Sequence, residues 1–435
     1  MSESESASQQ PEAEEQAGER HHQRLLSIIP KQRPLRPDPS GRYFINEAQH
    51  DSTRLAARMI PLAAPHLLAS LTNLLATAPP SLPWSGAFAK GLYCGLFVGP
   101  TSIAYLFLWL SKTHPDLLID GKSPADYCAA YLALDQDKYG PEETNRSGCS
   151  LNHEFMCYNA VKACHTQDLR YVRAFVDNID KLTMRPAFIE VLFGRAGLLS
   201  LMRTVKYFVP AAGEILDPHV DAVIEHCLSY DPWTFGVRPD HQKRYIGAAH
   251  GDIGIIASIV LSNASYAPRV QPRLERILAL QLEDGNWPAC DDDDSEKKGE
   301  ELVQFCHGAP GMIWCLVAIQ PFFPDLRDRI EAAVDKARGV VWEKGMLTKE
   351  PCLCHGITGN ALTLTEPQRS HFLFYATAGI VKNGLADGAF EKSSDESGLW
   401  WSEAGRAWGW MMMDYEQSGR GNSLRDIGFP GVTNP

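Results

Sequence analysis

The sequence predicts an all-α fold, an α/α toroid of six or seven helical hairpins whose inner helices surround a central axis. Two observations support this fold class. A Gly-x-x-Gly turn, often preceded by histidine, recurs about every 50 residues, and an apolar run with helical periodicity follows most copies. Glycines at fixed offsets before a helix allow a positive φ or a close approach of two backbones. Such glycines would crowd at one end of a shared axis, which favours a closed ring over an open solenoid.

The repeated turns can be followed in chain order. Loose copies lie at Gly95 or Gly99 and around 147–149, and the last copy has Ser402 in place of its first glycine. The full set of turns is 93–100, 147–149, 193–198, 249–254, 305–311, 353–360 and 401–406. The apolar runs predicted to be helices are 103–110, 155–163, 198–209, 255–261, 312–319 and 404–413. Each turn with its run is one copy of a helical hairpin.

The first 40 residues differ in kind from the rest of the chain. Residues 1–20 hold six glutamates and one arginine among small and polar residues, and so have almost nothing to bury. We therefore expect residues 1–40 to form a disordered acidic and polar tail. Residues 41–435 are expected to form one toroid domain with an apolar content, 44% over the whole chain, that suits a large core.

Composition also limits the partners and the compartment. The net charge is −12 and no basic stripe is present, so a nucleic acid is not expected as a partner. No apolar stretch reaches ~18 residues, which argues against a transmembrane segment. Eleven cysteines without regular spacing suit a reducing compartment. We expect a cytoplasmic protein, with nuclear access and peripheral association with the plasma membrane left open.

Two of the turns carry a Cys-His-Gly-x-x-Gly pattern. Cys306-His307 and Cys354-His355 are 48 residues apart, and His250 opens a third turn without cysteine. Thiolate and imidazole are ligands that zinc takes, and a catalytic zinc uses three protein ligands with one position left open. Cys306, Cys354 and His355 would make such a set, at one end of the ring axis. The alternative is that the cysteines are small buried residues that serve the glycine turns.

These three motifs, in this order, resemble the signature of the lanthionine synthetase C-like family in its eukaryotic branch, from about Arg42 to the Gly428-Phe429-Pro430 segment. The resemblance implies an α/α toroid with a central zinc held by Cys306, Cys354 and His355. It matches His250 to the histidine that handles protons. Histidine after the first zinc cysteine, here His307, is typical of the eukaryotic branch, whereas the bacterial cyclases have tyrosine there.

The chain departs from the bacterial pattern at two places. Glu190 stands where the resemblance implies a catalytic aspartate, and residues 300–305 lack the arginine expected before the first zinc cysteine. Cyclisation of antibiotic precursors is therefore not expected. The resemblance further implies glutathione as a co-substrate, with Lys349 and Arg42 matching residues that bind it, and cations suit a tripeptide with two carboxylates.

The function that follows is a zinc-dependent addition of the glutathione thiol to dehydroalanine or dehydrobutyrine in peptides or proteins. The thiolate would attack the β-carbon, and His250 or His307 would protonate the α-carbon, because imidazole titrates near neutral pH. The main alternative is a catalytically silent glutathione-binding or signalling adaptor with a receptor-like role. Glycoside processing is a third hypothesis, but it would need two facing carboxylates and no zinc.

Overall fold

The computed structural model describes residues 35–49, 51–56, 58–81, 95–134, 148–179, 188–236, 242–291, 302–392 and 397–435. Within these ranges the regular elements are helices, and β-type pairing is limited to isolated bridges. Most of the expected N-terminal tail lies outside the described residues, so its disorder and the domain boundary near residue 40 stay predictions. No helix in the described ranges has both the length and the apolar character needed to cross a bilayer.

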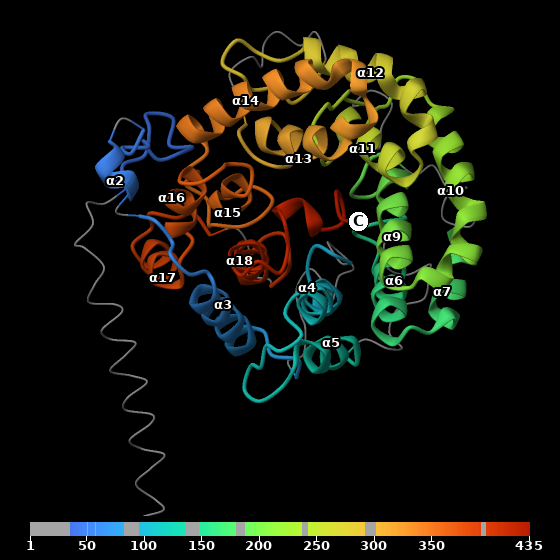
Figure 1. Cartoon of the computed structure of the whole chain (residues 1–435), viewed down its shortest axis with the longest axis horizontal. Helices are drawn as coiled ribbons and strands as arrows, with labels where there is room; N and C mark the ends of the chain where they lie inside the picture. The colour runs from blue at the N-terminus through green and yellow to red at the C-terminus, as the bar shows by residue number, and fades with distance from the viewer. Residues whose placement is uncertain are drawn as a thin grey trace, which may run out of the picture.

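The helices form two concentric rings: an inner ring surrounds the axis, and an outer ring surrounds the inner one (Figure 1). The inner helices are α4 (Pro100–Thr113), α6 (Glu154–Thr166), α9 (Arg195–Phe208), α11 (Asp252–Ser262), α13 (Ala309–Ile319), α15 (Ile357–Ala361) and α18 (Glu403–Gln417). Their outer partners, in the same order, are α5 (Pro124–Leu132), α7 (Leu169–Val176), α10 (Gly213–Leu228), α12 (Ala267–Ala279), α14 (Arg327–Lys344), α16 (Gln368–Phe374) and α3 (Ala64–Thr77). The described residues thus form a helical ring of paired helices, as the repeats predicted.

Shorter elements complete the described chain. They are α2 (Ser52–Ala56), α17 (Ala378–Ala386) and the 3-10 turns Pro210–Ala212, Ala264–Tyr266, Gln320–Phe322, Pro324–Leu326 and η7 (Leu424–Asp426). Each expected run falls within an inner helix, except that the run 198–209 ends one residue beyond α9.

Sequence pattern explains which helices are inside. The inner helix α13 is apolar on nearly all sides and buries most of its residues, as expected of a helix surrounded by protein. The outer helix α14 buries only Ile330, Ala333, Val334, Ala337, Val340 and Val341, which recur three or four residues apart. This stripe lies against the inner ring and leaves the charged face of α14 toward solvent.

The repeated turns gather at one end of the axis. The Phe305 backbone NH donates to the Cys354 carbonyl at 3.0 Å, and the Cys354 NH donates to the Trp400 carbonyl at 3.1 Å. Both physical roles expected for glycine occur there. Gly308 has a φ of 103°, and a Cβ on Gly359 would lie 1.9 Å from the Leu353 carbonyl oxygen. The glycines therefore allow each turn to fold closely against the start of its own helix.

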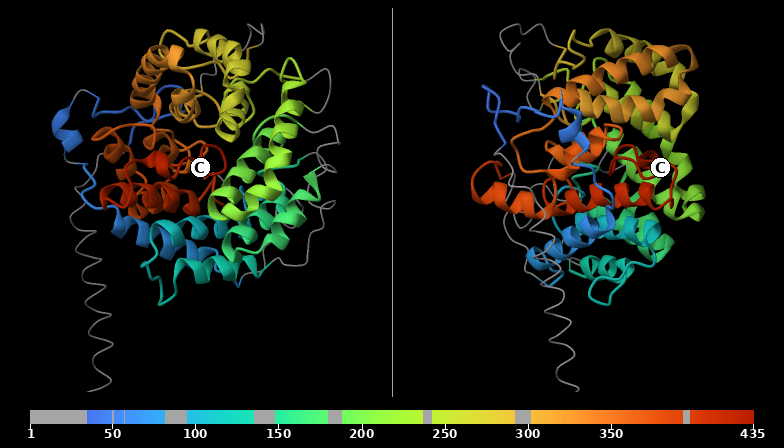
Figure 2. Two further views of the ribbon diagram at one scale, coloured as in Figure 1. Left: turned by 45° about the vertical axis from the view of Figure 1, so that its right-hand side comes forward. Right: turned by 60° about the vertical axis from the view of Figure 1, so that its left-hand side comes forward.

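The first and last helices of the ring are joined directly. The Gln417 side chain accepts from the Ala63 NH at 2.8 Å and donates to the Ile60 carbonyl at 3.0 Å. Figure 2 shows α18 beside α3 and α4 in both views. The C-terminal segment after η7 then turns into the ring, where Phe429 stacks on Phe305 with 3.5 Å between ring centroids. This segment packs directly beneath the turn that carries Cys306.

Candidate active site

The side chains of four turns meet at the end of the axis where the inner helices begin. Cys306 and His307 precede α13, Cys354 and His355 precede α15, and His250 precedes α11. The fourth turn, before α9, contributes Glu190. Because each of these four helices starts with a glycine at its N-cap, these residues are held on short turns at fixed distances from the helix ends.

The two predicted metal-ligand thiols contact one another. The Cys354 thiol donates a hydrogen bond to Cys306, and the Gln304 side-chain NH₂ donates to the Cys306 Sγ at 3.1 Å. Both cysteines are free thiols. The hydrogen bond from Cys354 lowers the pKa of Cys306, and the same contact, together with burial, raises the pKa of Cys354. Cys306 is therefore the thiol of the pair that ionises first.

His355 lies at the same end of the ring, near Lys349 and 6.3 Å from the Trp401 ring. Burial, with a smaller effect of the Lys349 charge, lowers the pKa of His355 to about 4. Its imidazole is therefore neutral at neutral pH. Within the described ranges no three His, Cys, Asp or Glu side chains are arranged closely enough to hold a metal ion. The structure thus brings the two thiols together without placing His355 in one group with them.

Glu190 and His250 form a buried pair. The Glu190 Oε2 atom lies 2.7 Å from the His250 Nδ1 atom, and the carboxylate also accepts from the backbone NH of Leu192 at 2.9 Å and of Phe193 at 2.5 Å. Burial lowers the pKa of His250, but the hydrogen bond and charge of Glu190 more than offset this, so the pKa is raised. A carboxylate on Nδ1 also fixes the orientation of the ring and leaves Nε2 for a substrate.

His307 lies beside this pair in a different state. Its ring centroid is 6.0 Å from that of His250 and 5.1 Å from that of Tyr245. Burial, with a smaller effect of the His250 charge, lowers the pKa of His307 to about 4. Its buried Nδ1 atom has no hydrogen-bond partner among the described residues. His307 is therefore a neutral imidazole at neutral pH, and its pKa is shifted in the opposite direction from that of His250.

An aromatic wall surrounds the two imidazoles. The Phe235 ring lies 4.5 Å from His250, and the Phe193 and Tyr245 rings lie 6.1 and 5.8 Å from it. Sequence reasoning did not select Phe235 or Tyr245, nor Gln304, which lies in the stretch where an arginine was expected. Their only sequence signal is position, since Tyr245 and Gln304 stand within a few residues of the histidine and cysteine motifs.

The two predicted glutathione residues lie on neighbouring segments. The Arg42 carbonyl accepts from the Thr348 NH at 3.1 Å, and Tyr43 forms an antiparallel bridge with Leu347. Lys349 follows directly, and its charge lowers the pKa values of Cys306, Cys354 and His355. Lys349 is therefore close to the thiols. Arg42 is joined to the same segment by a hydrogen bond of its backbone carbonyl.

A buried ion-pair network holds the Lys349 segment in place. The Arg406 guanidinium donates to the Glu350 carboxylate at 2.8 Å and to the Pro351 carbonyl at 2.9 Å, and it also pairs with Glu403 at 2.8 Å. Arg406 lies near the start of α18. It therefore joins the segment between Lys349 and Cys354 to the next inner helix, a role that no sequence motif indicated.

Comparison with known proteins agrees with this arrangement of turns. A family model described as "Lanthionine synthetase C-like protein" matches residues 157–370, which include His250, both cysteines and His355. The chain belongs to the lanthionine synthetase C-like family. The resemblance inferred from the three motifs is thereby confirmed.

Two curated relatives of this LanC-like chain are eukaryotic. One is "Glutathione S-transferase LANCL1" of Danio rerio, 33% identical over 194 residues, which are 40% of this chain and 44% of the relative. The other is "LanC-like protein GCL1" of Arabidopsis thaliana, 36% identical over 187 residues, 40% of each chain. The matches thus span less than half of either relative. Among solved structures, that of "Nisin cyclase" is similar with a TM-score of 0.45 and 15% identity, over 76% of this chain and 90% of the other.

Proposed function

We propose that this LanC-like chain binds glutathione and adds its thiol to dehydroalanine or dehydrobutyrine residues of peptides and proteins. The observation that carries the proposal is the Glu190–His250 pair beside the hydrogen-bonded thiols of Cys306 and Cys354. Glutathione is proposed as the co-substrate because the relative from Danio rerio is named "Glutathione S-transferase LANCL1".

The donor set suits zinc. Cys306, Cys354 and His355 would hold the ion, because two thiolates and one neutral imidazole are ligands of a type that zinc takes. The contact between the two thiols and the lowered pKa of His355 support this assignment. When bound, zinc supplies a Lewis acid that lowers the pKa of a thiol brought next to it.

The addition needs no oxidant or reductant. The glutathione sulfur forms a bond to the β-carbon, the π bond between the α- and β-carbons breaks, and a proton is delivered to the α-carbon. The thiol releases one proton, so the reaction is balanced. His250 is placed to accept and return this proton, because Glu190 fixes its ring and stabilises the imidazolium. His307 is neutral and is proposed to donate or accept a hydrogen bond rather than to carry charge.

Positive charge near the thiols would select the co-substrate. Lys349 is close enough to affect Cys306, Cys354 and His355, and a cation there attracts a carboxylate of glutathione. Arg42 is proposed as a second contact, because its backbone pairs with the segment that precedes Lys349. The aromatic wall of Phe193, Phe235 and Tyr245 would limit water around the reacting carbons.

Turnover tests the proposal directly. Purified full-length protein is incubated with glutathione and a dehydroalanine peptide, and the product is detected by mass spectrometry at the sum of the two reactant masses. We expect turnover that His250→Asn slows by roughly 10²–10⁴-fold with glutathione binding kept, the range for loss of an acid–base group. His219→Asn, on α10 and outside the site, is the matched control. Binding without any turnover of the parent protein would instead favour the silent adaptor.

Metal content tests the ligand assignment separately. We expect one zinc per chain in the parent protein and a loss of stoichiometric zinc in Cys306→Ala and Cys354→Ala. Cys290→Ala, at a cysteine outside the pair, should keep its zinc. Folded variants of both paired cysteines that retain full zinc would show that the assignment is wrong.

A further inference from the structure

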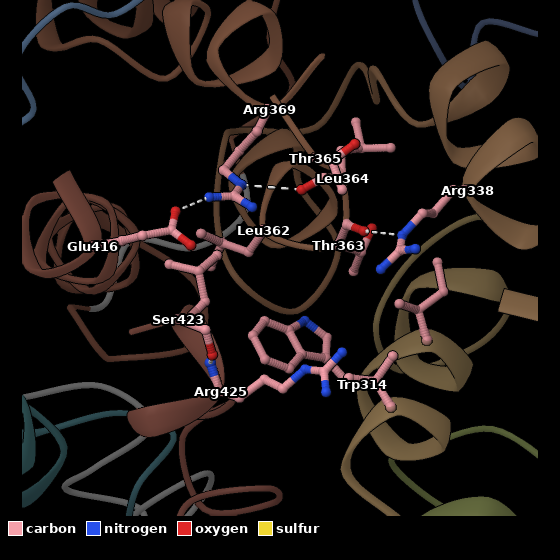
Figure 3. A pocket seen from close by; sticks show the side chains of 13 residues that line it. Trp314, Arg338, Leu362, Thr363, Leu364, Thr365, Arg369, Glu416, Ser423 and Arg425 are labelled. Carbon is pink, nitrogen blue, oxygen red and sulfur yellow. Dashed lines mark hydrogen bonds and ion pairs between the residues drawn. The ribbon is translucent and has the colours of Figure 1, made fainter. Parts of the chain in front are cut away.

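A cavity lies away from the cysteine and histidine turns, between α13 and α18 of the inner ring and α14 and α16 of the outer ring. Its volume is about 190 Å³, and its polar wall includes Trp314, Arg338, Thr363, Arg369, Glu416 and Arg425. Figure 3 shows these side chains around a common space. Thr363 follows the C-terminal end of α15, whereas Cys354 and His355 precede its N-terminus. The cavity therefore has no residue in common with the proposed active site.

The cavity exists because one inner helix is short. α15 has 5 residues, whereas its inner neighbours α13 and α18 have 11 and 15. The chain leaves the helix after Ala361 and runs through 362–365, which line the cavity together with residues of α13 and α18. The space that a longer inner helix would fill thus stays open, in a protein whose other inner helices pack closely.

Positive charge dominates the lining. Three arginines and one glutamate line the cavity, and Arg338 also pairs with Asp335 outside the lining, so the excess around the cavity is one positive charge. Arg369 pairs with Glu416 and donates to the Leu364 carbonyl, and Arg338 donates to the Thr363 carbonyl at 3.2 Å. Arg425 forms no ion pair within the described part of the chain. In Figure 3 the three guanidinium groups approach the cavity from different sides.

The indole ring of Trp314 forms an apolar wall of the cavity and carries one hydrogen-bond donor. Trp314 is 6% exposed, and its Nε1 atom is buried without a hydrogen-bond partner among the described residues. A buried N–H without a partner is unfavourable, so a bound acceptor would be favoured there. Leu362 and Leu424 also line the cavity. It therefore offers a flat apolar surface, one neutral donor and several guanidinium donors.

We propose that this cavity binds a small phosphate monoester with an apolar group. Guanidinium groups bind phosphate oxygens in paired hydrogen bonds, and an anion would offset the positive charge of Arg425, which has no ion pair among the described residues. The apolar part of the ester would lie against Trp314, and an ester oxygen would accept from its Nε1 atom. A volume of about 190 Å³ fits a compound of this size rather than a folded partner.

Binding of phenyl phosphate to full-length protein, measured by calorimetry, tests the proposal. We expect saturable binding that Arg425→Gln weakens at least about ten-fold, because a charge-assisted hydrogen bond to the phosphate is lost. Arg425 is exposed, so this substitution leaves the fold intact. Arg338→Gln is a second variant and should also weaken binding. Arg329→Gln, on the exposed face of α14, is the matched control and should bind as the parent does.

Two further probes separate the parts of the ligand. Inorganic phosphate should bind more weakly than phenyl phosphate if the apolar wall contributes, and phenyl sulfate should bind more weakly because it carries one charge. Absence of phenyl phosphate binding, or binding that neither Arg425→Gln nor Arg338→Gln weakens, would overturn the proposal. Equal affinity for inorganic phosphate would overturn the assignment of an ester.

Discussion

At the residue scale, the pKa values of two imidazoles 6.0 Å apart are shifted in opposite directions. Glu190 raises the pKa of His250, whereas burial and the charge on His250 lower the pKa of His307 to about 4. Groups whose pKa values are pushed apart in this way can divide the roles of a charged acid and a neutral polar group. The carboxylate that causes the difference is 2% exposed and has its other hydrogen bonds to backbone NH groups.

Replacing this carboxylate should change the histidine without removing it. In Glu190→Gln the opposing effect of the negative charge is lost, so burial should lower the pKa of His250 below its ordinary value. Fewer His250 rings are then protonated at pH 7, and addition should slow by about 10-fold or more. NMR titration of the imidazole and the pH–rate profile measure both effects. Glu214→Gln on the exposed side of α10 is the control, and an unchanged His250 titration would contradict the role of Glu190.

A second buried histidine should make stability depend on pH. His371 is fully buried, neither ring nitrogen has a hydrogen-bond partner within the described residues, and burial lowers its pKa to about 3. The unfolded chain binds a proton near pH 6.5, before the folded chain does, so stability should fall as pH drops from about 6.5 toward 3. The slope from this group is at most about 1.4 kcal/mol per pH unit. His371→Leu should flatten the pH dependence measured by urea unfolding, whereas His219→Leu should not.

At the element scale, the glycines determine how closely each turn folds back against the start of its own inner helix. The second glycine of the turn faces the backbone carbonyl of the residue six positions earlier, as Gly359 faces Leu353 and Gly311 faces Phe305. A carbonyl on a turn that is hydrogen-bonded to its neighbour cannot move freely. The spacing of the sequence motif is thus a consequence of backbone packing as well as of the chemistry at the site.

A pair of glycine substitutions separates packing from helix propensity. In Gly359→Ala the new Cβ would lie 1.9 Å from a backbone oxygen, so we expect a loss of stability of about 1–3 kcal/mol or more. Gly339, inside α14, has no atom within 4 Å of such a Cβ, so Gly339→Ala should raise stability by about 0.5–1 kcal/mol. Chemical denaturation measures both. Equal effects in the two variants would contradict the packing argument.

The sequence predicted the repeated elements well because glycine spacing and apolar periodicity are local signals. It placed the helices that follow His250 and Cys306 and the gathering of these turns at one end of the ring. It did not reveal that Glu190 binds His250, because that contact joins residues 60 positions apart. The early end of α15 was also missed. β-branched Thr363 and Thr365 and the following Pro367 are weak signals by themselves.

At the scale of the whole molecule, the Gln417 side chain joins the two ends of the ring, in addition to the packing of α18 on α3. The His66 ring of α3 stacks on Trp410 of α18, and the Gln417 amide satisfies one backbone NH and one backbone carbonyl of the segment before α3. Both groups would be partly buried without a partner if the amide were removed. This contact therefore connects local hydrogen bonding to the integrity of the ring.

Removing the amide should loosen the closure. We expect Gln417→Ala to cost about 1–3 kcal/mol and to raise hydrogen exchange in α3 more than in α9, which lies elsewhere in the ring. Gln320→Ala, whose side chain contacts only an exposed glutamate among the described residues, is the control. Exchange that rises equally in both helices would show that the ring opens as one unit rather than at the α3–α18 contact.

The join between α3 and α18 also bears on how the chain is made. The contact between Ala63 and Gln417 spans 354 residues, so at a synthesis rate of about 5–20 residues per second the apolar face of α3 stays uncovered on the order of 20–70 s after it emerges. The apolar face of a hairpin in the middle of the chain is covered as soon as the next hairpin has been synthesised. The buried face of α3, formed by Leu67, Leu71 and Leu74, is therefore the surface of the nascent chain that a chaperone would be expected to shield longest.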